Sequence, residues 1–190
     1  MNFAKEDITG IILAGGKSLR MGNDKALMLY KGKPMIQYSI DLLSNYCNKI
    51  LISANGTGYE TFGMPVVKDS FINQGPMAGL LACLEKSTTP INICLPCDAP
   101  DMQPSVIEKL INLSDTEHCV VPLSPLAEPL IAIYPHTVIP VLRKLLEEGT
   151  NKMTEIFKIF PVHFVPFNNL QEFSEISSFN NINTPDDISE

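Results

Sequence analysis

The sequence lacks any apolar run of the roughly 20 residues that a membrane-spanning helix needs. Its first residues, MNFAKEDITG, contain no apolar stretch of signal-peptide length, so we expect no secretory leader. Basic residues are also scarce, because 14 Lys and Arg stand against 21 Asp and Glu and give a net charge of −7. A chain without a basic stripe is a poor candidate for binding nucleic acid or an anionic membrane. We therefore expect a cytoplasmic protein.

Cysteine and histidine are too sparse to indicate a disulfide framework, a zinc site or a catalytic base. The five cysteines are scattered and odd in number, which predicts free thiols. Cys94 and Cys97 form a Cys-x-x-Cys, but no second pair completes a zinc site, so structural thiols are favoured over a zinc or redox module. His118, His136 and His163 lie in or beside expected strands without a Ser or Asp at a catalytic spacing. We expect core or surface histidines rather than catalytic bases.

What the sequence does contain is an alternation of strands and helices. Its 190 residues suffice for one domain, residues 1–190, with its own core. The alternation predicts an α/β fold with three layers, in which helices cover a mostly parallel sheet. Short β-branched runs predict strands at 8–14, 49–55, 64–70, 91–98, 119–123, 129–135 and 162–167. Helical spacing and proline or glycine punctuation predict helices at 33–47, 75–87, 103–114 and 137–149, with a last turn in 180–189.

Glycine and polar residues stand at the expected carboxyl ends of the strands. Gly15, Asn55, Asp69 and Asp98 each follow or end such a strand. Ligands of parallel α/β sheets bind at the carboxyl ends of the strands. We expect these residues to meet at one edge of the sheet.

The stretch ILAGGKSLRMGNDKAL (11–26) joins a glycine turn to several cations. A Walker A loop would need glycine at Ile11, and a dinucleotide-binding fingerprint would need glycine at Lys17, so neither motif fits. The backbone amides of a glycine turn can still face a phosphate, with Arg20 and Lys25 neutralising it. The competing interpretation is a solvated loop with surface cations.

Asp98 ends an expected strand and begins the stretch DAPD. A carboxylate there can hold Mg²⁺, which binds one or two carboxylates together with phosphate oxygens and water. An Asx turn at the strand exit explains the same residues equally well. Asp101 is expected to cap the helix that follows.

The order of motifs resembles a known enzyme family. The stretch LAGGKSLRMGNDKALM is similar to the signature of nucleotidyltransferases that transfer a nucleoside monophosphate and release pyrophosphate. DSFINQGPMAGLLACL, LPCDAPDM, EPLIAIY and NNINTPDD follow in order. Together they resemble the MobA-like molybdenum cofactor guanylyltransferases from about residue 8 to the C-terminus. The resemblance implies a Rossmann-like nucleotidyltransferase fold of the glycosyltransferase A type.

The resemblance also implies roles for individual residues. Lys25 would bind the phosphates with help from Arg20, and Asp98 would carry Mg²⁺, so these three residues would be catalytic. The nucleotide-binding positions that the resemblance implies are Leu13, Ala14, Gly15, Gly16, Lys25, Asn55, Asp69, Gly79 and Asp98.

Within that set, the resemblance places Asn55 and Asp69 on the nucleoside side and Gly79 in a loop and helix packed near the nucleotide. Asn181 and Asn183 match an Asn-x-Asn before Thr-Pro and would lie near the metal and phosphates.

Two stretches depart from the family pattern. The segment before Glu128, LSPLAEPL, is shorter than the polar, glycine-containing loop of many relatives, so the pterin side is expected to be built differently. After residue 149 a single Lys152 stands where relatives often carry arginine.

The implied reaction joins GMP from GTP to the terminal phosphate of molybdopterin, or of its molybdenum-loaded form, and releases pyrophosphate. That phosphate is already an anion, so no strong general base is needed. The implied partners are these substrates, proteins that deliver the cofactor and chaperones of molybdoenzymes, and we expect a monomer with at most weak self-association. The alternatives are a cytidylyl- or sugar-phosphate nucleotidyltransferase of the same fold, or a non-catalytic protein that binds GTP.

Overall fold

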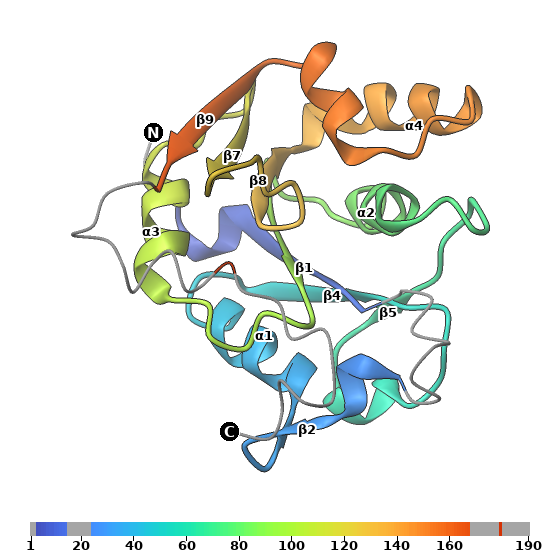
Figure 1. Cartoon of the computed structure of the whole chain (residues 1–190), viewed down its shortest axis with the longest axis vertical. Helices are drawn as coiled ribbons and strands as arrows, with labels where there is room; N and C mark the ends of the chain where they lie inside the picture. Colours follow the sequence, from blue (N-terminus) through green and yellow to red (C-terminus); the bar gives the residue numbers. More distant parts are fainter. Residues whose placement is uncertain (1–2, 15–23, 168–178, 180–190) are drawn as a thin grey trace.

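The computed structural model describes residues 3–14, 24–167 and 179, and a seven-stranded sheet forms its centre (Figure 1). The strand order is β5-β4-β1-β6-β8-β7-β9. All neighbouring pairs are parallel except those that β8 makes with β6 and β7, so β8 alone runs against the others. The predicted mostly parallel sheet is confirmed. The strands are β1 Ile8–Leu13, β4 Lys49–Ser53, β5 Val66–Val67, β6 Ile91–Pro96, β7 Cys119–Leu123, β8 Ala132–Pro135 and β9 Val162–Pro166.

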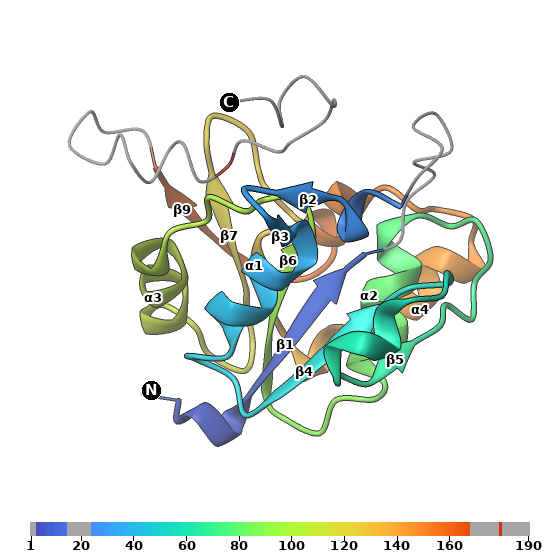
Figure 2. The same cartoon turned by 90° about the horizontal axis from the view of Figure 1, so that it is seen from below.

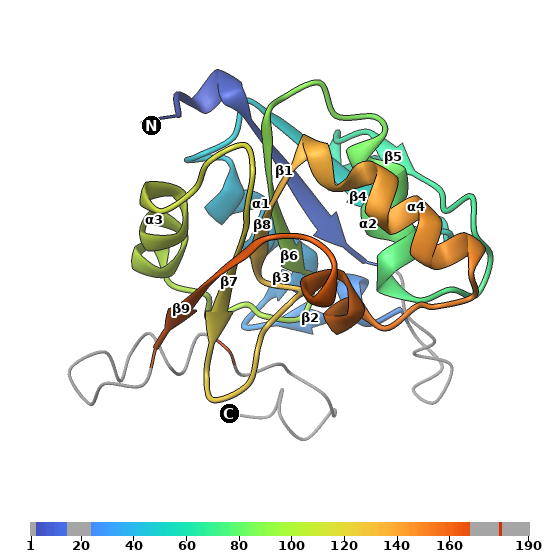
Figure 3. The ribbon, with the colours of Figure 1, turned by 90° about the horizontal axis from the view of Figure 1, so that it is seen from above.

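Four α-helices cover the two faces of this sheet. On one face α1 and α3 bury side chains in a core cluster that includes Ile12 of β1, and α1 lies in front of the sheet in Figure 2. On the other face α2 and α4 pack in a second cluster with Ile11, the neighbouring residue of the same strand, and α4 lies in front in Figure 3. Successive side chains of a strand point to opposite faces, so β1 contributes to both clusters. The helices are α1 Met35–Leu43, α2 Pro76–Leu84, α3 Pro104–Asn112 and α4 Ile139–Glu147.

The central strands are hydrophobic along their whole length because both of their faces are covered. Every residue of β1 and of β6 is buried. Such continuous apolar runs are typical of parallel sheets between helix layers. The strands and helices expected from the sequence are all present in the described residues, although most are shorter by a few residues at their ends. The turn expected within 180–189 lies outside the described residues.

One small element was not expected from the sequence. Strands β2 (Leu29–Tyr30) and β3 (Lys33–Pro34) form an antiparallel hairpin before α1. Lys31 and Gly32 both have positive φ, 47° and 80°, as the two central residues of a type I′ turn require. Two-residue strands leave almost no periodic pattern, so sequence reasoning passes over them.

The helices of the described residues are short. None of them is long and apolar enough to cross a membrane.

Candidate active site

The order of the strands creates a switch point between β1 and β6. The chain leaves β1 for β4 and β5 on one side and then returns to β6 on the other side of β1. Leu13, the last residue of β1, pairs with Pro96, and the Cys97 amide donates a hydrogen bond to the Leu13 carbonyl at 3.2 Å. Crevices at the carboxyl ends of strands on either side of such a point are the usual ligand sites of open α/β sheets.

Two opposite charges meet at this switch point. Lys25 begins a 3-10 turn, Lys25–Leu27, and Asp98 follows the end of β6. The Lys25 Nζ atom lies 2.7 Å from Asp98 Oδ2, and the side chains are 13% and 20% exposed. The fold therefore brings together two residues to which the resemblance assigns catalytic roles. Their partial exposure leaves both groups within reach of a ligand that enters from solvent.

Local hydrogen bonds fix the backbone on which Lys25 stands. Asp24 caps the turn, because its Oδ1 atom accepts a hydrogen bond from the Ala26 amide at 3.2 Å. Its other oxygen, Oδ2, lies 2.6 Å from the hydroxyl of Tyr59. That hydroxyl also lies 2.9 Å from the Ala14 carbonyl, so its single proton is shared by two acceptors.

Tyr59 thus joins the residue that follows β1 to the residue that precedes Lys25. The ring is 1% exposed, and burial, followed by the nearby Asp24 carboxylate, raises the pKa of its hydroxyl well above the usual value. A phenol that stays protonated can keep donating its hydrogen bond. Sequence reasoning missed Tyr59 and Asp24, since only the fold brings Tyr59, which lies beyond β4, to this place.

A buried thiol, Cys97, lies close to the charged groups of the site. Burial raises the pKa of Cys97, the Asp98 and Asp24 carboxylates raise it further, and Lys25 acts in the opposite direction. The Lys25–Asp98 ion pair can exchange partners when a polyanion with its counter-ion binds.

Asn55 and Asp69 form a second polar pair, beyond the ends of β4 and β5. The Asn55 side-chain amide donates to Asp69 Oδ2 at 3.0 Å, and its carbonyl oxygen accepts from the Asp69 backbone amide at 3.1 Å. The Ser53 hydroxyl donates to Asp69 Oδ1 at 3.4 Å. The Ala14 amide donates to the Ser53 carbonyl, which ties this pair to the end of β1. Asn55 and Asp69, two of the residues expected to meet at this edge, are therefore in direct contact.

Gly79 lies within α2, against the end of β4. A Cβ atom there would collide with the Ser53 hydroxyl and lie 3.3 Å from Asp69 Oδ1. Only glycine lets the helix approach this closely. Gly79 is itself buried, so it does not line an open crevice. Its role is to let α2 pack against the Ser53 and Asp69 side chains.

Asp101 does not cap α3, so that expectation was wrong. The first residue before α3 is Gln103, and no side chain caps the helix. The Asp101 carboxylate instead accepts a hydrogen bond from the Tyr30 hydroxyl at 3.2 Å and lies 3.9 Å from the Lys31 ammonium. The carboxylate is therefore held by the β2–β3 hairpin and not by the helix that follows it in the sequence.

Several predicted site residues cannot be placed. Gly15, Gly16, Arg20, Asn181 and Asn183 lie outside the described residues.

The short segment before Glu128 closes tightly at the carboxyl end of β7. Leu123 pairs with Ala127, and the Glu128 amide donates to the Pro122 carbonyl at 3.0 Å. Burial raises the pKa of the Glu128 carboxyl. The segment therefore folds back on the end of its own strand.

Cys97 is a buried thiol beside the charged groups of this site, whereas His118 and His163 lie elsewhere. All five cysteines are free and buried, which confirms the expectation of structural thiols. His118 and His163 lie together at the start of β7 and β9, the opposite edge of the sheet from Asp98.

A single carboxylate that faces a polyphosphate suits a divalent ion of the magnesium kind, which prefers oxygen ligands and retains several waters. Asp98 is such a carboxylate, placed at the strand end and partly exposed. The residues present therefore fit a metal that arrives together with phosphate oxygens.

Comparisons with known proteins agree with this geometry. Residues 10–162 match the family described as the MobA-like NTP transferase domain. A relative from Cupriavidus metallidurans, molybdenum cofactor guanylyltransferase, is 34% identical and covers 97% of this chain and 94% of its own.

Two solved structures give the same picture of the fold. Molybdopterin-guanine dinucleotide biosynthesis protein A from Archaeoglobus fulgidus superposes with a TM-score of 0.79 at 25% identity, over 95% of this chain and 94% of that one. A 4-diphosphocytidyl-2C-methyl-D-erythritol synthase from Anaerococcus prevotii superposes with a TM-score of 0.71 at 13% identity, over 97% and 95% of the two chains. The second likeness concerns the fold alone.

Proposed function

The chain belongs to the MobA-like NTP transferase family and is a nucleotidyltransferase, and on this premise we propose how its site transfers GMP from GTP to molybdopterin. An oxygen of the terminal phosphate of molybdopterin attacks the α-phosphorus of GTP. The bond between the α-phosphorus and the bridging oxygen breaks, and its electron pair leaves with pyrophosphate. The product is a molybdopterin guanine dinucleotide.

This reaction asks little of a general base. The attacking phosphate is already ionised, so the main requirements are neutralisation of the triphosphate charge and in-line alignment of the reacting atoms. The absence of a histidine from the described part of the site is consistent with this chemistry.

The observation that carries the proposal is the Lys25–Asp98 pair at the switch point. We propose that the Lys25 ammonium moves from Asp98 to the phosphates when GTP binds, which releases Asp98 for the metal. Nucleotidyl transfer in this family generally uses a divalent metal. We propose Mg²⁺, held by Asp98 and the phosphate oxygens, where it would neutralise charge on the triphosphate.

The remaining roles follow the layout of the edge. The backbone of Leu13 and Ala14 ends β1 beside the pair and would contact the nucleotide. Asn55 and Asp69 would lie on the nucleoside side. The close packing of α2 at Gly79 would hold Asp69 in place.

Residues outside the described part of the chain complete the proposed site. Gly15 and Gly16 would offer backbone amides to phosphate, and Arg20 would add a second cation. Asn181 and Asn183 would approach the metal and phosphates. Residues 1–190 as one domain, cofactor-delivery proteins and molybdoenzyme chaperones as partners, a monomeric state and a cytoplasmic location stay predictions.

The test is a substrate panel with matched variants. Pyrophosphate release would be followed from Mg-GTP and from Mg-CTP, each with and without the molybdenum cofactor. Release with GTP and cofactor together, lost in Asp98→Asn, is the expected result. Asp41→Asn is the control, since Asp41 lies on α1 and forms an exposed ion pair of 2.6 Å with Lys33 of β3.

Any other outcome would contradict a specific part of the proposal. Release with CTP instead of GTP would keep the chemistry and change the base. Binding of Mg-GTP without any pyrophosphate release would contradict transfer and indicate a GTP-binding protein.

A further inference from the structure

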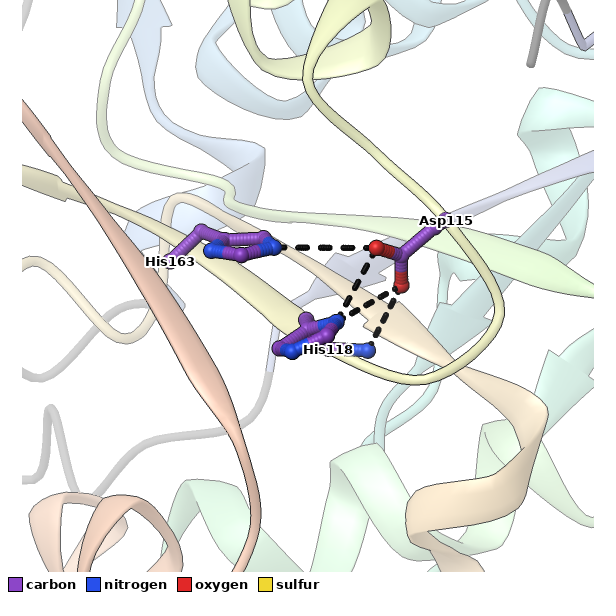
Figure 4. Close-up of side chains that lie close together, drawn as sticks. All are labelled: Asp115, His118 and His163. Carbon is purple, nitrogen blue, oxygen red and sulfur yellow. Dashed lines mark hydrogen bonds and ion pairs between the residues drawn. The ribbon is translucent and has the colours of Figure 1, made fainter.

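Three side chains with metal-binding atoms gather at the edge of the sheet opposite the candidate active site (Figure 4). Asp115 lies in the loop between α3 and β7, His118 immediately precedes β7, and His163 belongs to the edge strand β9. His118 and His163 are 45 positions apart in the sequence. The parallel register of β7 and β9, in which Cys119 pairs with Val162 and Val120 with His163, brings them together.

The ligand atoms of these residues are close enough to share one ion. His118 Nδ1 lies 3.0 Å from Asp115 Oδ2, and His163 Nε2 lies 3.6 Å from the same oxygen. One ligand atom from each of the three residues lies within 4.8 Å of those from the other two. Ligands about 2.0–2.1 Å from a tetrahedral ion are separated by about 3.4 Å, so the spacing of these atoms is close to what one ion requires.

The carboxylate is held in place by the backbone. Asp115 Oδ1 accepts hydrogen bonds from the amides of Glu117 at 2.7 Å and His118 at 2.8 Å. The Thr137 hydroxyl donates to the Thr116 carbonyl at 2.8 Å and anchors the same loop to the start of α4. Supporting hydrogen bonds of this kind orient metal ligands in proteins. His118 Nδ1 also lies 3.1 Å from Oδ1, so this ring faces both oxygens of the carboxylate, and Oδ2 is the oxygen that His163 approaches as well.

We propose that Asp115, His118 and His163 form a binding site for a divalent transition-metal ion of the zinc class. Two imidazoles and one carboxylate are borderline ligands that suit Zn²⁺, Co²⁺ or Ni²⁺, whereas Mg²⁺ prefers oxygen ligands alone. The side chains of His118 and Asp115 are 31% and 35% exposed and that of His163 is 48% exposed, so an ion can enter and water can fill a further coordination position.

The imidazole rings must turn before an ion binds. They are stacked, with centroids 4.0 Å apart and planes 21° from parallel, whereas a metal lies in the plane of each ring that binds it. Rotation about the Cβ–Cγ bonds opens the stack, and the exposure of His163 on the edge strand leaves room for it. An ion would then join β9 to the loop before β7.

This site is separate from the proposed transfer of GMP. β7 runs parallel to β6, so the start of β7 lies at the edge opposite the end of β6 that leads to Asp98. The length of β7 alone is about 13 Å. The inference does not depend on the proposed function, and its test reads metal binding rather than turnover.

The test uses the reduced, tag-free chain, because a histidine tag would bind the same ions. Zn²⁺ would be titrated calorimetrically, with Mg²⁺ for comparison, and Tm would be measured with and without Zn²⁺. His163→Gln is the main variant, since it leaves the Asp115 turn intact, and His118→Gln is the second. His136→Gln is the matched control, as His136 is exposed and outside the cluster.

We expect one Zn²⁺ to bind per chain and to raise Tm, no comparable binding of Mg²⁺, and at least about a tenfold loss of Zn²⁺ affinity in both cluster variants. His136→Gln would bind like the unmodified chain. With Co²⁺ the protein should show the visible absorption of a nitrogen and oxygen site without the charge-transfer band of a thiolate. Absence of Zn²⁺ binding, or Zn²⁺ binding that both cluster variants retain, would overturn the proposal.

Discussion

Two polar groups lie at opposite edges of the same sheet. The ion pair of Lys25 and Asp98 lies at the carboxyl ends of β1 and β6. The cluster of Asp115, His118 and His163 lies where β7 and β9 begin. The first group offers an ammonium and a carboxylate, which suit phosphate and an oxygen-loving ion. The second offers two imidazoles and a carboxylate, which suit a softer ion. Both groups stand on the same sheet and each contains a carboxylate. The comparison teaches that the ligand a carboxylate suits depends on its end of the strands and on the side chains beside it.

The two groups also differ in what brings their side chains together. The groups at the carboxyl edge follow successive parallel strands, so the topology brings them together whatever the loops contain. The cluster at the other edge depends on one register between β7 and β9. A shift of that register by one residue would turn His163 to the opposite face of the sheet.

The largest expected effect is a difference in turnover between variants of two lysine–aspartate pairs. Lys25→Ala should lower turnover about 10²- to 10³-fold, the range for loss of one preorganised charge-stabilising group. Lys33→Ala breaks the exposed pair with Asp41 and should leave turnover within about twofold, as surface pairs contribute little. Steady-state rates of pyrophosphate release measure both, with circular dichroism to verify folding. Equal turnover of the two variants would remove Lys25 from the chemistry.

A second effect tests the close approach of α2 to β4. Gly79→Ala should destabilise the protein by about 1–3 kcal/mol, since the new Cβ atom displaces the Ser53 hydroxyl and the Asp69 side chain beside it. It should also weaken GTP binding several-fold. Urea denaturation and nucleotide titration provide the two measurements.

A double variant sharpens this prediction. In a Ser53→Ala background the colliding oxygen is gone, so Gly79→Ala should cost much less than it does alone. Equal costs in both backgrounds would show that contact with Ser53 is not the reason for glycine at this position.

A smaller effect is expected from the hydroxyl that joins Ala14 to Asp24. Tyr59→Phe leaves the buried Ala14 carbonyl and the Asp24 carboxylate with a partner fewer and should cost about 1–3 kcal/mol of stability. Because the hydroxyl positions the backbone before Lys25, KM for GTP should rise more than kcat falls. Tyr46→Phe is the control, as the Tyr46 hydroxyl bonds Glu108 between α1 and α3. The prediction fails if the two variants have the same KM.

The smallest effect concerns the core between the two edges. Burial raises the pKa of Cys47 and of Cys83 to about 12, against about 8.5 for a free thiol. At pH 8 these thiols stay protonated in the folded chain, and only above their raised pKa values would they ionise. A thiol reagent at pH 8 should therefore modify almost nothing in the native protein and all five cysteines after unfolding. Rapid modification of the native chain would show that the core opens readily.

Much of this arrangement could be predicted from the sequence. The apolar run of β1 and the punctuation of α2 by Gly75 and Pro76 define their elements locally, and parallel strands then imply a shared carboxyl edge for Asn55, Asp69 and Asp98. Those inferences depend on short-range patterns and one general property of parallel sheets.

The rest depends on contacts that only the fold specifies. Tyr59 reaches Ala14 and Asp24 across the molecule, and the Asp101 carboxylate is taken by Tyr30 of the hairpin rather than by the helix that it precedes in sequence. His118 and His163 look unrelated until two strands pair. Side chains far apart in the sequence have no periodic signal, so sequence patterns do not reveal these meetings.

The most direct test of the central claim follows the α-phosphate of GTP. The protein would be incubated with Mg²⁺, molybdenum cofactor and GTP labelled at the α-phosphorus, and the products would be separated by chromatography. The account predicts that the label moves into the pterin dinucleotide while unlabelled pyrophosphate appears in equal amount. Label that stays in GDP, with inorganic phosphate released, would instead show hydrolysis of the γ-phosphate and contradict nucleotidyl transfer at this site.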